Sequence, residues 1–324
     1  TKALPQYAGH YQPHLPGDLG FYDLEIPYKL RNQVELAKKY GLYGFCFHYY
    51  YFSGRKILET PINNLLKEKA IDFPFCICWA NESWTRRWDG SETDVLLQQV
   101  YSEDNDLGFI KDIEVYLRDD RYIRFSGKPI IVVYKVSDLP DPKKTVLRWR
   151  EYCRDVGIGE IHLIAALSFN IKSPLSYGFD AGVEFPPHNI FSTRVSNKSL
   201  RLFNKDFSGA VHSYEALVAS ELAFKNYDFP CYRTAFPSWD NEARKTGKGL
   251  SFFGANPESF MRWLIGIMGY AKKMKESSVT IEEAIFINAW NEWAEGAHLE
   301  PDRRFGYAYL DSLSKALSFH KILK

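Results

Sequence analysis

The sequence predicts an α/β protein, and within that class a (β/α)8 barrel of the TIM type whose first strand is missing from this chain. Seven apolar, strand-like runs alternate with helical patterns, which is typical of parallel strands joined by helical crossovers. Polar and aromatic residues gather at the carboxyl end of each run, where barrel enzymes carry their sites. The alternative is a doubly wound open sheet, but none of the runs is followed by a Gly-rich phosphate turn.

The chain begins with a loop, Thr1–Tyr22, that is rich in Pro, Gly, His and Tyr and contains no strand-like run. A helix over Pro27–Tyr40 follows, because Leu30 and Val34 lie on one apolar stripe and Gly41 ends the pattern. A helix that precedes the first strand is what a barrel without its initial strand would show.

The remaining elements alternate regularly. Short apolar runs predict strands at Leu42–Phe52, Phe73–Trp79, Pro129–Val136, Ile161–Leu167, Gly182–Phe185, Cys231–Ala235 and Ala284–Ala289. Amphipathic or capped segments predict helices at Leu58–Lys69, Asp104–Leu117, Pro142–Val156, Tyr214–Phe224, Pro257–Lys275 and Gly306–Leu323. Polar stretches at Asn189–Ala210 and 241–256 are expected to be loops, and the Lys and Arg residues of 194–205 and 244–248 to be solvated loop faces. We expect one domain over residues 1–324.

Composition excludes several classes of function. With 324 residues, 45% hydrophobic and 25% charged, the chain can bury a large core. A net charge of +1 gives no basic face for nucleic acid, and no apolar run is long enough to span a membrane. The five cysteines are expected to be reduced core thiols, with no metal or cofactor. A bacterial cytoplasmic location is favoured, although the missing first strand leaves a signal peptide open.

The predicted strand ends supply the candidate site. Tryptophan offers a flat apolar face on which sugar rings stack, and amide, imidazole and carboxylate groups can hydrogen-bond hydroxyls. Each of these residues has a structural interpretation as core packing or surface pairing. The candidate substrate-binding residues are His48, Tyr49, Trp79, Asn81, Glu82, Trp84, Arg87, Glu184, His188, Trp239, Asp240, Trp290, Asn291 and Trp293.

Glu292 and Glu295 are the candidate catalytic pair. They are three residues apart, so on a helical turn both carboxylates face one direction, whereas on a strand they would oppose each other. Close approach of two carboxylates raises one pKa and leaves an acid and a base near neutral pH. The alternative is an exposed acidic turn or salt bridges to the arginines at 86, 87 or 303. His10, His14 and Asp18 of the opening loop are candidates to close over the site.

Other chemistries lack their signatures. The sequence contains no G-x-S-x-G elbow and no cysteine placed beside a histidine as a nucleophile.

Long motifs resemble the WbsX-like proteins, which are named as glycosyltransferases of bacterial O-antigen and other polysaccharide loci. The motifs span most of the chain and are Gly9–Asp23, Tyr43–Phe52, Phe75–Asp89, Trp290–Gly296 and Leu299–Pro301. That family is similar to glycoside hydrolase family 99, the (β/α)8-barrel endo-α-mannosidases and endo-α-mannanases. Family members carry a first strand and a Trp-rich loop before the Gly9 motif, and this chain has neither.

The resemblance implies a retaining mechanism through a 1,2-anhydro sugar, carried by the Glu-Trp-x-Glu motif. Glu292 would deprotonate the 2-hydroxyl, and Glu295 would protonate the leaving oxygen. We therefore expect a retaining, endo-acting glycoside hydrolase on a bacterial or mannan-like oligo- or polysaccharide with α-manno- or α-rhamno-type sugars. The alternatives are a glycosyltransferase in O-antigen or lipopolysaccharide biosynthesis and a non-catalytic polysaccharide-binding barrel.

Overall fold

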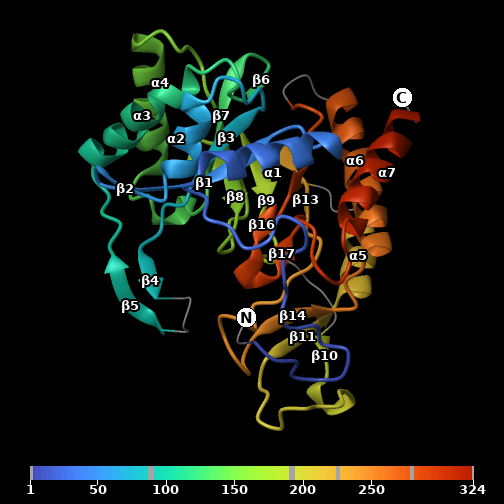
Figure 1. The fold of residues 1–324 in the computed structure, drawn as a ribbon. Helices are drawn as coiled ribbons and strands as arrows, with labels where there is room; N and C mark the ends of the chain where they lie inside the picture. The colour runs from blue at the N-terminus through green and yellow to red at the C-terminus, as the bar shows by residue number, and fades with distance from the viewer. Residues whose placement is uncertain (1–2, 87–90, 190–193, 224–226, 278–280, 323–324) are drawn as a thin grey trace.

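The computed structural model describes residues 3–86, 91–189, 194–223, 227–277 and 281–322 (Figure 1). All seven predicted helices are confirmed, with ends within about three residues of the expected positions. They are α1 (Pro27–Lys39), α2 (Thr60–Lys67), α3 (Glu103–Leu117), α4 (Pro142–Asp155), α5 (Tyr214–Leu222), α6 (Pro257–Ser277) and α7 (Ala308–Ile322). Their starts follow local chemistry: Ser102 and Asp141 cap α3 and α4 by accepting hydrogen bonds from the first free backbone N–H groups. None of the described helices is both long and apolar enough to cross a membrane.

The predicted strands form a mainly parallel sheet whose spatial order follows the chain. The consecutive parallel neighbours are β1 (Phe45–Phe52), β3 (Phe75–Trp79), β7 (Lys128–Val133), β8 (His162–Leu167), β9 (Ala181–Glu184) and β12 (Cys231–Tyr232). One residue later, β13 (Thr234–Ala235) pairs in parallel with β15 (Phe286–Ile287). Two short antiparallel strands, β2 (Arg55–Ile57) and β6 (Arg124–Phe125), add to β1 and β7. The carboxyl ends of all the parallel strands therefore meet at one edge.

The sheet does not close on itself within the described residues. No ladder there joins β15 to β1, although the rings of Trp290 and Phe45 approach to 5.3 Å across the opening. The closed eight-stranded barrel therefore stays a prediction. The expectation of a buried strand over Ala284–Ala289 is wrong: only Phe286–Ile287 forms a ladder, and the segment is half-buried because it is paired on one side only.

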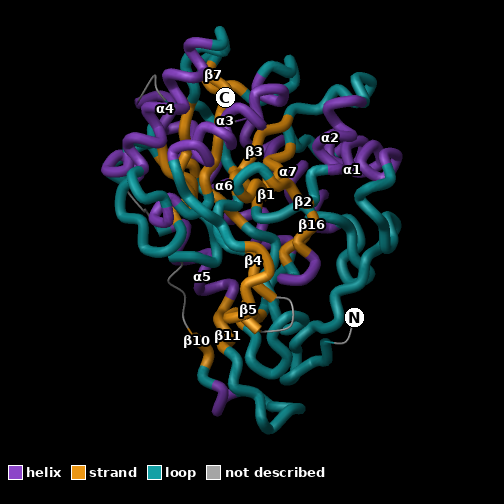
Figure 2. Tube along the Cα trace, turned by 90° about the vertical axis from the view of Figure 1, so that its left-hand side faces the viewer, coloured by secondary structure: helices purple, strands orange, loops and turns teal. Residues whose placement is uncertain are grey.

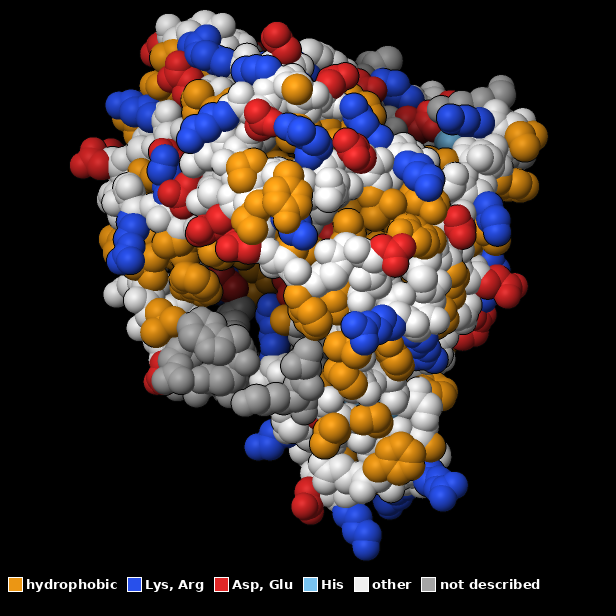
Figure 3. Space-filling model, viewed as in Figure 1, with side chains coloured by type: hydrophobic (Ala, Val, Ile, Leu, Met, Phe, Trp, Pro, Cys, Tyr) orange, Lys and Arg blue, Asp and Glu red, His pale blue; other side chains and the backbone are white. Residues whose placement is uncertain are grey.

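Beyond the carboxyl edge, two structures project that the sequence did not predict (Figures 1 and 2). One is the hairpin of β4 (Trp84–Arg86) and β5 (Ser91–Leu97). The other is a small sheet of β10 (Arg194–Val195), β11 (Ala210–Ser213) and β14 (Leu250–Phe253), which corrects the expectation of loops at 189–210 and 241–256. The strands of the small sheet are too short for a periodic signal, and β11 pairs with β14 about forty residues further along the chain. Figure 3 shows the molecule hollowed between the two projections, with acidic and basic side chains deep in the hollow.

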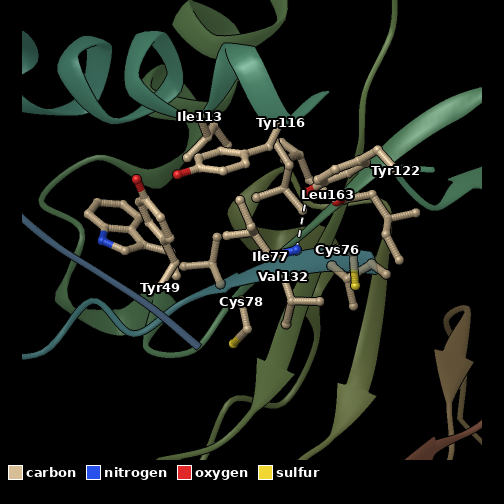
Figure 4. Packing of buried hydrophobic residues seen from close by; sticks show 14 of the residues in the cluster. Tyr49, Cys76, Ile77, Cys78, Ile113, Tyr116, Tyr122, Val132 and Leu163 are labelled. Carbon is tan, nitrogen blue, oxygen red and sulfur yellow. Dashed lines mark hydrogen bonds between the residues drawn. The ribbon is translucent and has the colours of Figure 1, made fainter. Parts of the chain in front are cut away.

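The core surrounds the parallel strands. Ile113 and Tyr116 of α3 pack on one face of β3, while the side chains of Cys76 and Cys78 point to the opposite face (Figure 4). A second apolar cluster joins α5, α6 and α7 to β13 and the turn that follows it. All five cysteines are free, as expected for reduced core thiols.

Ile131 provides a test of this packing, because its side chain lies on β7 with no exposed surface. Ile131→Ala is expected to lower the free energy of unfolding by about 2–5 kcal/mol, through lost burial and the cavity left behind. Val115 on α3 is 52% exposed, so Val115→Ala should change stability by less than about 0.5 kcal/mol. Urea unfolding followed by circular dichroism measures both; equal losses would contradict the described packing.

Candidate active site

The two candidate catalytic glutamates lie on one tight turn at the carboxyl edge. Glu292 ends the two-residue strand β16 (Asn291–Glu292), and a 3-10 turn over Trp293–Glu295 follows directly. The turn ends at Gly296, whose backbone is left-handed at φ 60° and leaves no space for a side chain against Asp240. The expectation of a helical turn is confirmed, and β17 (Ala297–His298) then returns antiparallel to β16.

Both carboxylates bind one guanidinium. Arg244 contacts Glu295 Oε1 at 2.8 Å through Nη1 and Glu292 Oε1 at 3.0 Å through Nη2. Because both carboxylates bind the same planar guanidinium, they must lie close to each other. The expectation that Arg244 lies on a solvated loop face is wrong. Its sequence neighbourhood gives no sign of this role, because the contact joins residues about fifty positions apart.

The surroundings of Glu292 favour its protonated form relative to an exposed carboxyl. Burial raises the pKa of Glu292 above its ordinary value, and the charge of Arg244 opposes this shift. Burial, and then the nearby Glu292 carboxylate, raise the pKa of Tyr50 to about 12, so this hydroxyl stays protonated at neutral pH. The Tyr50 ring stacks with Trp84 of the β4–β5 hairpin, with ring centroids 6.1 Å apart.

A second recess of about 350 Å³ lies at the ends of β8 and β9 and is lined partly by Asn170, Phe185 and His188. His188 Nε2 lies 3.0 Å from the hydroxyl of Tyr134, and the exposed His48 ring lies 5.9 Å from Phe185. The rings of His48 and Tyr134 are 6.4 Å apart, so Tyr134 lies between the two histidines, which come from the non-adjacent strand ends of β1 and β9.

Two of the predicted contact residues are wrong because their side chains are in the core. Tyr49 is 1% exposed and donates its hydroxyl to Asp112 of α3, on the face opposite to His48. Trp79, also 1% exposed, stacks on Phe109 with ring centroids 4.3 Å apart. Alternation along a strand sends neighbouring side chains to opposite faces, so a strand end delivers only every second residue to the site.

The polar groups of Asn81 and Glu184 are bound to neighbouring protein groups and stabilise the fold. Asn81 is fully buried and exchanges hydrogen bonds with the backbone of Lys135 at 2.7 and 2.9 Å. Glu184 lines the second recess but is held by Arg233 at 2.7 Å, by the Tyr227 hydroxyl at 2.7 Å and by a backbone N–H. A carboxylate with this many donors is structural, so the expectation that Glu184 and Asn81 contact substrate is not supported by their bonding.

The remaining candidates lie at the base of the β4–β5 hairpin, in the second core or at the open side of the sheet. Glu82 lies 3.9 Å from Lys135 Nζ, at the base of the hairpin that carries Trp84. Trp239 is buried at 7% exposure and packs in the second core. Trp290 is half-buried at the open side of the sheet. Arg87 lies outside the described residues.

Sequence reasoning missed a network that fixes the turn from behind. Glu300 accepts hydrogen bonds at 2.7 Å from the Trp293 indole and from the Tyr22 hydroxyl, which itself accepts a bond from Asn291 at 3.2 Å. Glu300 lies in the Leu299–Pro301 motif, so its position in that motif was the available signal. Asn291 and Trp293 are therefore held as positioning groups.

The opening loop packs behind the same turn. His10 Nε2 lies 2.7 Å from Asp240 Oδ2, and the backbone N–H of Asp240 donates to the carbonyl of Glu295 at 2.7 Å. Burial, and then the neighbouring His298, lower the pKa of His14 to about 4. Asp18 accepts a hydrogen bond from Tyr307 at the surface. Together these contacts join the opening loop to the ends of β13 and β15.

The arrangement can supply acid–base chemistry to a polar substrate. Two carboxylates converge on one guanidinium, the pKa of one of them is raised, and the stacked rings of Tyr50 and Trp84 lie nearby. The described residues around the carboxylates are fixed by hydrogen bonds from neighbouring loops, so the pair is preorganised.

Comparisons with known proteins show the family and the fold of this chain. Residues 1–313 match the family model described as "Glycosyltransferase WbsX". The chain is 45% identical over 318 residues to "Uncharacterized protein WxcX" of Xanthomonas campestris pv. campestris in two strains. The match covers 98% of this chain and 45% of the relative, so the chain spans about half of that protein's length.

Solved structures show the fold. A "Glycoside hydrolase-like protein" superposes with a TM-score of 0.64 at 15% identity, covering 98% of this chain and 95% of its own. The GH99 endo-alpha-mannosidase from Bacteroides thetaiotaomicron superposes with a TM-score of 0.56 at 11% identity, covering 98% and 91%. Because the family model matches residues 1–313 and the relative is 45% identical, the chain belongs to the WbsX family of carbohydrate-active proteins.

Proposed function

We propose that this chain is the catalytic unit of a retaining, endo-acting glycoside hydrolase that cleaves a polysaccharide containing α-manno- or α-rhamno-type sugars. The observation that carries the proposal is the convergence of Glu292 and Glu295 on the Arg244 guanidinium. The fold shared with an endo-alpha-mannosidase supports the substrate class. We further propose that the open parallel sheet is the greater part of a (β/α)8 barrel, with this site at its carboxyl end.

In the proposed reaction, Glu292 is the base. It removes the proton of the sugar's 2-hydroxyl, and that oxygen attacks the anomeric carbon to form a 1,2-anhydro ring while Glu295 gives its proton to the departing glycosidic oxygen. In the second step, Glu295 takes a proton from the water that attacks the anomeric carbon, and Glu292 returns its proton to the 2-oxygen as the ring opens, so the 2-hydroxyl is restored and the first product keeps its configuration. The route needs a 2-hydroxyl trans to the bond that breaks, as α-mannosides and α-rhamnosides have.

Arg244 has a positioning role in this scheme. A guanidinium bonded to Glu295 opposes the protonation that a general acid needs, so substrate must displace it from Glu295 before the chemistry. Tyr50 and Trp84 offer the stacked aromatic wall beside Glu292, and His48 and His188 offer hydrogen bonds in the neighbouring recess.

Glycosyl transfer is the second candidate, because the matching family is described as a glycosyltransferase. A retaining pair of carboxylates serves either reaction, depending on whether water or a sugar hydroxyl opens the intermediate. The two differ in the acceptor and not in the roles of Glu292 and Glu295.

Glu292→Gln and Glu295→Gln should each lower the rate of glycosidic-bond cleavage or transfer by at least about 10²-fold, because each removes a group that moves a proton. Glu276→Gln, at an exposed position of α6, is the matched control and should keep the wild-type rate. The rates are measured as new reducing ends released from α-mannan or α-rhamnan. Full activity in both variants would contradict the proposal and favour a non-catalytic binding protein.

Arg244→Met should move the acidic limb of the rate profile upward by on the order of 1 pH unit. Arg244 lowers the pKa of Glu292, so its removal raises that pKa, and the base is then deprotonated only at higher pH. Activity of the variant and wild type is compared from pH 4 to 8. A limb that stays in place or moves downward would show that Glu292 is not the base.

A further inference from the structure

Two histidines and an aspartate behind the catalytic turn form a cluster that the proposed reaction does not use. His14, His298 and Asp302 each present a ligand atom, and these atoms all lie within 4.8 Å of one another. His14 Nδ1 lies 3.0 Å from His298 Nε2, and His298 Nε2 lies 4.0 Å from Asp302 Oδ2. His298 and Asp302 are 3% and 5% exposed.

Each of these side chains is oriented by a partner on its other side. His298 Nδ1 lies 3.2 Å from the carbonyl of Glu300 and donates to it, which leaves the Nε2 lone pair facing His14 and Asp302. Asp302 Oδ1 accepts two backbone hydrogen bonds, from Arg304 at 3.0 Å and Phe305 at 2.6 Å, so its Oδ2 faces the histidines. His14 turns its Nε2 toward Asp240 Oδ2, 4.0 Å away.

This pattern is the one that metal-binding histidines show. A ligating imidazole points one nitrogen at the ion and gives the N–H of its other nitrogen to a carbonyl or a carboxylate. Here His298 gives its Nδ1–H to a carbonyl, and the Asp240 carboxylate lies on the outer side of His14, 4.0 Å from its Nε2 and beyond hydrogen-bond distance. His10 donates to the same carboxylate at 2.7 Å, and so fixes Asp240 in place.

The spacing suits a small divalent ion. A tetrahedral Zn²⁺ with bonds of about 2.0–2.1 Å needs ligand atoms roughly 3.3 Å apart. The separation of His298 Nε2 from His14 Nδ1 is 3.0 Å and that from Asp302 Oδ2 is 4.0 Å, both within about 1 Å of that value. The cluster borders a cavity of about 260 Å³, which gives an entry path and room for a water as fourth ligand. The described residues that line the cavity include two carboxylates, Asp240 and Asp302, and one arginine, Arg304. The two negative charges outnumber the one positive charge, which favours binding of a cation.

We propose that His14, His298 and Asp302 bind a Zn²⁺-like first-row divalent cation that fastens the opening loop to the turn carrying Glu292 and Glu295. The His298 ring stacks on Trp293 with centroids 3.8 Å apart, so an ion at this site holds the turn from behind and takes no part in the acid–base steps. It joins three segments that are far apart in sequence: residue 14, the 238–240 loop through Asp240, and residues 298–302. The inference does not rest on the proposed function.

The test uses untagged protein that has been stripped with a chelator and dialysed, titrated with Zn²⁺ in competition with a chromophoric chelator. One tight site per chain is expected, and His14→Gln or Asp302→Asn should weaken it by at least about 10-fold. His320→Gln is the matched control, because His320 lies on α7, away from the cluster, and contacts Glu283. It should bind like wild type.

Co²⁺ loaded into the wild-type protein gives a second readout that requires no variant to fold. A visible absorption band from a four-coordinate site with histidine nitrogens is expected, and Zn²⁺ should displace it. Zn²⁺ should also raise the melting temperature of the wild type, because an ion that binds only the folded state stabilises it. The proposal is overturned if the wild type binds neither ion, or if binding is unchanged in both ligand variants.

Discussion

One main-chain hydrogen bond connects the two halves of the site. The N–H of Asp240, just after β13, donates to the carbonyl of Glu295, just after β15, at 2.7 Å. The parallel pairing of β13 with β15 sets this approach, and Gly296 permits it because a side chain there would collide with Asp240. Without that close contact, the turn would not present Glu292 and Glu295 in one direction, and the shared guanidinium could not reach both.

The residues in front of the turn and those behind it have different effects on the two glutamates. Arg244 and Tyr50 set the electrostatics in front of the turn, where burial keeps the pKa of Glu292 above its ordinary value. Glu300 and the histidine cluster hold the turn from behind, through Trp293. The two carboxylates are thus held in place by hydrogen bonds and ring contacts from the segments around them.

The sequence predicted the regular part of the molecule well and the irregular part poorly. All seven helices and the order of the parallel strands follow from apolar periodicity and caps, which are local signals. The β10–β11–β14 sheet and the contact of Arg244 with the two glutamates were not predicted, because both join residues that are far apart in the chain. The prediction that Tyr49 and Trp79 belong to the site is wrong because it rests only on their closeness to a strand end. Successive side chains of a strand point to opposite faces, and these two point into the core.

The configuration of the first product tests the central claim most directly. Proton NMR of the anomeric region, recorded while the protein acts on an α-linked oligosaccharide, distinguishes retention from inversion before the sugar mutarotates. If Glu292 and Glu295 work through a 1,2-anhydro intermediate, the first product keeps the α configuration, whether water or a sugar is the acceptor. A first product with the β configuration would show direct displacement by water and would contradict the roles given to both glutamates.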